Sequence, residues 1–112
     1  MNYKTASDFE INCLVANKIT GKDHNFTSGS FCVRTGRPAC ICCLDTVVLK
    51  DYCNSWSDAG PIIERKFIGL RFAEEHDFNC WMAESTSDPS ISWLDKNPLR
   101  AICIVFLMME GE

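Results

Sequence analysis

Apolar residues are most concentrated near the end of the chain, where Ala101 to Met109 form an unbroken run of nine positions. The segment 97–100, Asn-Pro-Leu-Arg, comes directly before the run. Asn is a favoured helix cap, and Pro suits the first helical position because its missing N–H would have no partner there. A helix apolar on all sides must be enclosed, and crossing a bilayer takes roughly 20 residues. The pattern therefore predicts a C-terminal helix buried in protein.

A second helical pattern lies near the N-terminus. Ser7 and Glu10 fit a capping box, in which each side chain satisfies a backbone N–H at the helix start. Gly21 supplies a stop, because glycine readily adopts the left-handed conformation that ends helices. The apolar face between these signals follows helical spacing and consists of Ile11, Leu14, Val15 and Ile19. The spacing predicts a helix over 8–20.

Two alternating patterns predict the main sheet. Apolar residues occupy every second position of 68–72 and again of 78–83, which is typical of half-buried strands. The link 73–77 is too short for a parallel connection, so the strands should pair as an antiparallel hairpin. Before them, Asp58 can cap a short helix with Pro61 in its first turn. We therefore predict a helix over residues 59–66.

The segment 22–53 is a cysteine-rich insert with weaker patterning. Residues 22–30 are polar and without a period, which is typical of a loop. Cysteine, aromatic and β-branched residues fill 31–34 and 39–50, and the segment 35–38 between them has turn composition. This arrangement predicts a hairpin, with the alternative that its second arm is partly helical.

Together these elements predict an α+β fold in one domain, residues 1–112. We expect an antiparallel sheet of about three to four strands with helices packed on it, including the N-terminal helix and the buried C-terminal helix. A loop over 85–92 leads into the last helix. With 112 residues, 46% hydrophobic and 23% charged, the composition is that of a globular domain with its own core.

Three blocks of the sequence resemble the NinX-like proteins of tailed phages. They are 7–12 (SDFEIN), 51–54 (DYCN) with 57–63 (SDAGPII), and 97–109 (NPLRAICIVFLMM), in the same order as in that family. The last two blocks are also similar to small phage domains called ABA sandwiches, which implies helices on both faces of an antiparallel sheet. The resemblance implies an accessory early protein of a phage or prophage, without implying a particular reaction.

The chain departs from that family pattern in two places. Gly60 stands where relatives tend to carry Trp before Pro-Ile-Ile, so an aromatic contact is lost there unless Trp56 replaces it. The cysteine-rich stretch from Cys32 to Cys53 is not part of the pattern either. The function of this stretch is therefore to be judged from its own residues.

The eight cysteines are expected to be reduced. The first residues contain no apolar stretch of signal-peptide type, which favours the cytoplasm of the host cell. A zinc site could be formed by Cys32, Cys40, Cys43 and Cys53, since 40–43 contains a C-x-x-C. Strong zinc signatures pair two such motifs, and free cysteine commonly packs as a small hydrophobe. We expect buried thiols and no metal cofactor, with redox chemistry and zinc as alternatives.

Catalytic residues are sparse. The two histidines, His24 and His76, fall in a predicted loop and a predicted turn, where side chains are usually solvated, so a Cys–His nucleophile is not expected. The acidic residues Glu74, Glu75 and Asp77 are typical of a solvated hairpin turn, which is expected here rather than an acid–base pair. We predict that the protein is not an enzyme. The net charge of -4 argues against binding to duplex nucleic acid, and no membrane association is expected.

The candidate binding residues are Trp56, Asp58 and Trp93. Each tryptophan is predicted in a loop, where its ring either seals the edge of the core or anchors a partner. The leading hypothesis is a noncatalytic protein that binds a host or phage protein, for host takeover or against host defence. One alternative is a zinc-stabilised recognition module using Cys32–Cys53, and another is a binder of a small ligand such as a nucleotide signal. A homo-oligomer is expected if the last helix is covered on one side only.

Overall fold

The computed structural model describes residues 2–21, 39–42, 45–75 and 78–111, and shows an α+β fold as predicted. The elements in chain order are α1 (Asp8–Thr20), β1 (Ala39–Cys42), β2 (Asp45–Val48), α2 (Trp56–Lys66), β3 (Ile68–Glu75), β4 (Phe78–Ser85), β5 (Ser92–Asp95) and α3 (Pro98–Met109). None of the helices in these ranges is long and apolar enough to cross a membrane.

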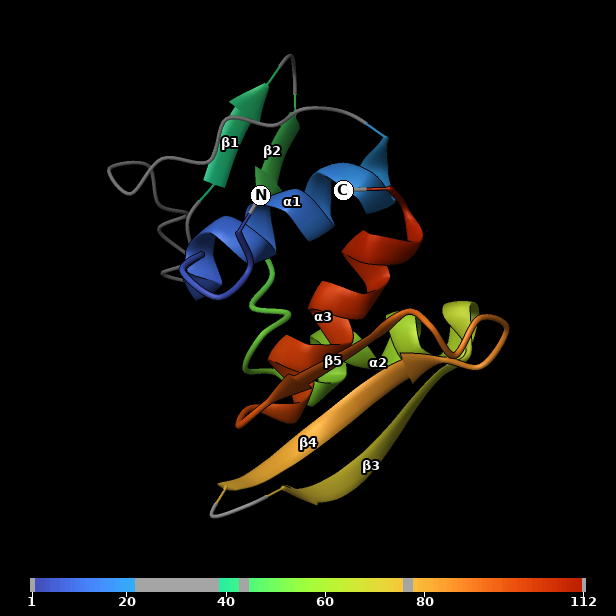
Figure 1. Ribbon diagram of the computed structural model, residues 1–112. Helices are drawn as coiled ribbons and strands as arrows, with labels where there is room; N and C mark the ends of the chain where they lie inside the picture. Colours follow the sequence, from blue (N-terminus) through green and yellow to red (C-terminus); the bar gives the residue numbers. More distant parts are fainter. Residues whose placement is uncertain (1, 22–38, 43–44, 76–77, 112) are drawn as a thin grey trace.

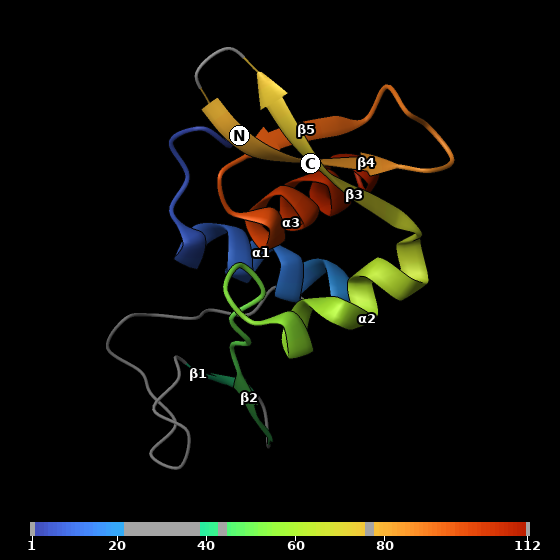
Figure 2. The same cartoon turned by 90° about the horizontal axis from the view of Figure 1, so that it is seen from below.

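The molecule is layered around α3. The antiparallel sheet β3-β4-β5 lies on one side of this helix, and α1 and α2 lie on the other (Figure 2). The ABA-sandwich resemblance implied helices on both faces of the sheet. In the described ranges, all three helices lie on one face. The apolar surface of α3 explains this order, since a helix without a polar side needs cover on opposite sides.

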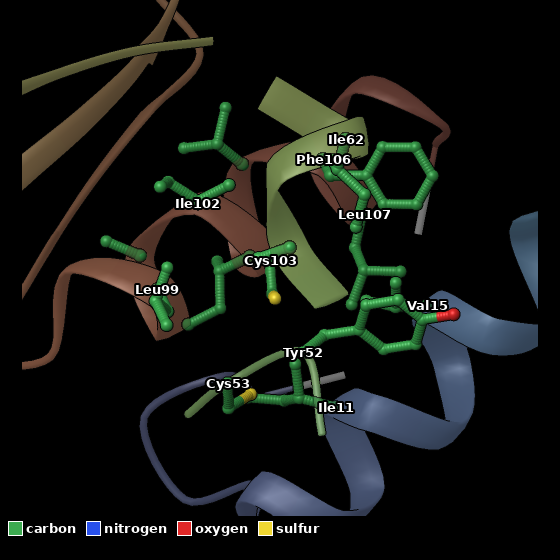
Figure 3. Packing of buried hydrophobic residues seen from close by; sticks show 14 of the residues in the cluster. Ile11, Val15, Tyr52, Cys53, Ile62, Leu99, Ile102, Cys103, Phe106 and Leu107 are labelled. Carbon is green, nitrogen blue, oxygen red and sulfur yellow. The ribbon is translucent and has the colours of Figure 1, made fainter. Parts of the chain in front are cut away.

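Helix α3 matches its prediction closely. The Asn97 side chain accepts hydrogen bonds from the backbone N–H groups of Leu99 and Arg100, with Pro98 at the helix start. Its buried residues are Leu99, Ala101, Ile102, Cys103, Ile104, Val105, Phe106 and Leu107. Figure 3 shows several of these packed with residues of α1 and α2. Because this chain itself encloses α3, the helix provides no argument for a second copy, and self-association stays a prediction.

Helix α1 also begins and ends where predicted. The Ser7 hydroxyl accepts the backbone N–H of Glu10, and Gly21 ends the helix in the left-handed conformation at φ 72°. The apolar face is shorter than predicted, because Ile19 is 42% exposed whereas Ile11 and Val15 are fully buried. The core side is completed instead by small or polar residues, namely Asn12 and Ala16.

Helix α2 starts at Trp56, three residues earlier than the predicted position 59. Its cap is Ser55, whose hydroxyl accepts the backbone N–H of Asp58 at 3.4 Å. Asp58, the predicted cap, lies inside the helix instead, and its carboxylate accepts the Asp51 N–H. Pro61 consequently lies inside the helix rather than in its first turn.

The hairpin β3–β4 confirms the alternating pattern, with Ile68 opposite Ser85 and Leu70 opposite Ala83. The sequence missed β5, which lies within and beyond the predicted loop and has only four residues.

Farther from the core, β1 pairs with β2 in a separate two-stranded sheet. The segment 39–50, predicted as one arm of a hairpin, therefore contains both strands, because the alternation of apolar residues is the same for one strand as for two. Residues 31–38 lie outside the described ranges.

Candidate functional site

The blocks that carried the resemblance meet at one polar junction. Arg100, at the start of α3, donates from Nη1 to Asp8 Oδ1 at 2.7 Å and from Nε to Asp95 Oδ2 at 3.2 Å. Its Nη2 donates to the backbone carbonyl oxygens of Tyr3, at 2.8 Å, and Ala6. One largely buried guanidinium therefore joins the N-terminal segment, α1, the end of β5 and α3.

Three asparagines complete the junction. Asn12, only 6% exposed, donates to Asp51 Oδ1 and accepts the backbone N–H of Cys53, both at 3.0 Å. The side chain of Asn97 donates to the Cys53 carbonyl at 2.7 Å, and Asn54 donates to Asp51 at 3.1 Å. These polar groups satisfy one another, so the junction holds the fold together rather than offering free groups to a ligand.

The structure places Trp56 and Asp58 on the first turn of α2 and not in a loop. Trp56 is 57% exposed and so does not seal the core. Asp58 lies at the rim of a pocket, and one of its carboxylate oxygens accepts a backbone N–H. Trp56 remains a predicted partner contact.

Trp93 lies on β5, half-buried against the core, with its ring edge-to-face to Tyr3 at 5.8 Å between centroids. Its indole N–H is buried, and among the described residues it has no hydrogen-bond partner. Since β5 and α2 lie on opposite sides of α3, the structure does not bring Trp93 together with Trp56 (Figure 2). The three candidate binding residues do not form one site.

The predicted zinc ligands are only partly described. Cys32 and Cys43 lie outside the described residues, and Cys40 is on β1. Cys53 is fully buried in the core next to Cys103 (Figure 3). Within the described ranges no group of three or more metal-binding side chains occurs. The zinc hypothesis stays a prediction.

Burial also controls the chemistry of the described thiols. A hydrogen bond with Cys53, followed by burial, raises the pKa of Cys103 well above its ordinary value. Burial, and then the negative charge of Glu10, raise the pKa of Cys13 from 9.0 to about 11. Both side chains are therefore neutral thiols at physiological pH, whereas a nucleophile would require the thiolate.

These shifts predict a loss of stability in alkali. Above pH 9.0 the unfolded chain releases the Cys13 proton, whereas the folded chain retains it up to a pKa of about 11. The folded state then binds more protons than the unfolded state, so the free energy of unfolding falls as the pH rises through this window. Urea unfolding measured across this pH window tests the prediction. The free energy of unfolding of Cys13→Ala should fall less steeply with pH than that of the wild type. Equal slopes for the two proteins would contradict the assignment.

The predicted catalytic candidates lie where nothing can be said of their side chains. His24, His76 and Asp77 are outside the described residues, and only the backbone of Glu74 and Glu75 is described, at the end of β3. The absence of catalysis remains a prediction.

The far face of the sheet has no described element packed on it, yet it carries apolar side chains. The register places Arg71, Met82 and Leu94 in one row across the three strands, with Ala73 opposite Cys80 in the next. Leu94 is 37% exposed, and Met82 is half-buried beside the Arg71 guanidinium. By the same register this face also carries Glu84 opposite Ser92, so apolar and polar residues are mixed on it.

The helix-side face of the same hairpin ends in an aromatic pair, of which Phe72 is exposed and Trp81 half-buried. Phe72 and Trp81 are cross-strand partners, with ring centroids 5.4 Å apart and an edge-to-face angle of 75°. Both point to the face that packs on α3, but the hairpin reaches beyond that helix (Figure 1). Phe72 is consequently 53% exposed. We call the pair Phe72 and Trp81 the hairpin surface.

A pocket opens on the opposite side of the molecule, where the C-terminal ends of the helices approach one another. Its volume is about 490 Å³. It is lined by Lys18, Ile19, Lys50, Tyr52, Asp58, Pro61, Ile62, Arg65, Lys66, Phe106 and Glu110. These residues come from α1, α2, α3 and the segment before α2, so the pocket exists only in the folded chain.

The comparisons with known proteins give one match. A family model described as Bacteriophage P22, NinX matches residues 2–110. No curated protein and no solved structure matches the chain. The matched range includes every described helix and strand, and therefore the polar junction, the hairpin surface and the pocket.

Proposed function

The chain belongs to the bacteriophage P22 NinX family and is a phage accessory protein, and we propose that it works without catalysis, by binding a protein of the host or of the phage. Such binding would serve host takeover or act against host defence. The observation that carries the proposal is the hairpin surface, an aromatic pair whose Phe72 ring stays 53% exposed although it lies on the face of the sheet that packs on α3.

The chemistry of the hairpin surface suits a protein partner. Aromatic rings are enriched in the buried centres of protein interfaces, because they remove large apolar areas from water. Phe72 and Trp81 are held in place by their edge-to-face contact and by the strand pairing beneath them. A partner would therefore meet a surface that is ordered before binding.

The noncatalytic part of the proposal is supported by the described thiols. Cys13 and Cys103 are held as neutral thiols, and Cys53 and Cys103 have no exposed surface through which a substrate could reach them. The polar groups of the junction are engaged in structural hydrogen bonds. Binding therefore accounts for the exposed features better than a reaction does.

Capture from a lysate of infected host cells tests the proposal with two matched variants. Phe72→Glu and Phe67→Glu each place the same charge at an exposed phenylalanine, 53% and 71% exposed respectively. Loss of an aromatic anchor costs about 2 kcal/mol or more, so Phe72→Glu should lower recovery of the specific partner at least about tenfold. Phe67→Glu should recover it as the wild type does. The recovered protein is then identified, and its affinity is measured with purified components.

Two results would refute the proposal. One is that no specific protein is recovered at native abundance and low salt. The other is that both variants recover the partner equally well, because the hairpin surface would then not be the contact. Trp56→Glu, made in parallel, shows whether the first turn of α2 belongs to the same interface.

A further inference from the structure

The pocket concentrates positive charge in an acidic protein. The chain has a net charge of -4 and 11 lysines and arginines, and four of these line the pocket together with two acids. Glu110 is paired with Lys66 at 2.9 Å, and Asp58 accepts a backbone N–H. Among the described residues, Lys50 and Arg65 have no ion pair. The pocket therefore presents cations that an anionic ligand could neutralise.

Helix dipoles explain the positions of some cations that line the pocket, but not of all of them. Lys18 lies in the last turn of α1, and Arg65 and Lys66 lie in the last turn of α2, where cations offset the negative end of the helix dipole. Lys50 belongs to no helix. Lys50 adds a further cation to the lining of the same cavity, and no helix dipole accounts for its position there.

The floor of the pocket is apolar and aromatic. Tyr52, Ile62 and Phe106 are 6%, 3% and 3% exposed, and Lys66 Nζ lies over the Phe106 ring at 5.9 Å from its centroid, whereas Pro61 and Ile19 are exposed. Burial, and then the charge of Asp58, raise the pKa of Tyr52. A planar apolar group could lie against Ile19 and Pro61, next to the charged groups of the lining.

We propose that this pocket binds a nucleotide, with its phosphates between Lys50 and Arg65 and its base against the exposed apolar lining at Ile19 and Pro61. The volume of about 490 Å³ lies within the range of small-ligand sites, about 300–1,000 Å³. Guanidinium and ammonium groups are the usual partners of phosphate oxygens. The site is separate from the hairpin surface, so its test is independent of the proposed protein partner.

Calorimetry and thermal unfolding with defined probes test the proposal. The probes are a panel of ribonucleoside triphosphates and cyclic nucleotides, inorganic pyrophosphate for the charge alone, and nucleosides for the base alone. At least one nucleotide should bind more tightly than pyrophosphate and more tightly than its nucleoside, and its affinity should fall with added salt. It should also raise Tm, because it binds only the folded chain. If no nucleotide binds, or if pyrophosphate binds equally well, the proposal is overturned.

Charge-reversal variants locate the site. Lys50→Glu and Arg65→Glu should each weaken nucleotide binding by at least about tenfold, the effect of losing one charge-assisted hydrogen bond. Lys4→Glu makes the same change of charge at an exposed lysine outside the pocket and should bind as the wild type does. A milder pair, Lys50→Gln and Arg65→Gln, repeats the test if either Glu variant unfolds. Equal weakening by Lys4→Glu would overturn the assignment, since it would show attraction by overall charge only.

Discussion

Replacing Ile104 by Asp is expected to leave no folded, soluble protein. Ile104 has no exposed surface and lies near the middle of α3, with the sheet on one side of that helix and α1 and α2 on the other. A carboxylate at this position can neither reach water nor find a partner, which costs several kcal/mol. A domain of this kind has only about 5–15 kcal/mol in total, so the loss is comparable with the whole free energy of unfolding.

The soluble fraction after expression and the thermal melt of any purified material measure this effect. Two variants control for it. Ile104→Val removes one methyl group, should cost about 0.5–1.5 kcal/mol, and should fold. Met109→Asp places the same charge on the same helix at its half-buried last residue, and should also fold. If Ile104→Asp melted like the wild type, α3 could not be the central layer.

Where the sequence predicted an element well, the signal was local. Helices α1 and α3 carry their own caps in Ser7 and Asn97, and their apolar residues follow a helical pattern between those caps and the helix ends. The alternation in β3 and β4 is equally local. Helix α2 was placed three residues late because its predicted cap was Asp58, whereas in the folded chain Ser55 is the cap and the Asp58 carboxylate accepts the Asp51 N–H.

The pocket and the hairpin surface, both proposed as binding sites, could not be predicted in the same way, because each depends on how segments of the chain pack. The pocket joins segments from Lys18 to Glu110. The hairpin surface depends on where α3 stops covering the sheet, which is a property of packing and not of the alternating pattern. Phe72 has the same parity as Leu70, yet it is 53% exposed whereas Leu70 packs against the core. The sequence identified Trp56 and Trp93 as aromatic residues of interest, but could not show that α3 separates them.

The polar junction connects the three sequence blocks that resemble the family, and the resemblance alone did not show that these blocks contact one another. Asp8 and Arg100 belong to the first and last of the matching blocks, and the middle block supplies Cys53 and Asn54 to the same network. Because the partners are up to 97 residues apart, no spacing rule could pair them. The blocks resemble the family at the positions where three segments of the fold are joined.

Removing the Arg100 side chain should therefore cost nearly as much as the core substitution. Its side chain is 13% exposed, and in Arg100→Met the carboxylate of Asp95 and the carbonyl oxygens of Tyr3 and Ala6 lose their donor. Breaking a buried ion pair by removing one partner costs about 3–5 kcal/mol, which lowers Tm by roughly 10–20 °C in a domain of this size. Arg100→Lys keeps the charge but cannot reach four acceptors, so it should recover only part of the loss.

A double-mutant cycle of Arg100→Met with Asp8→Asn isolates the bond between those two residues, and hydrogen exchange at residues 2–7 should increase in Arg100→Met. An Arg100→Met protein that melts like the wild type, with an unchanged N-terminal segment, would show that the junction does not hold these blocks together.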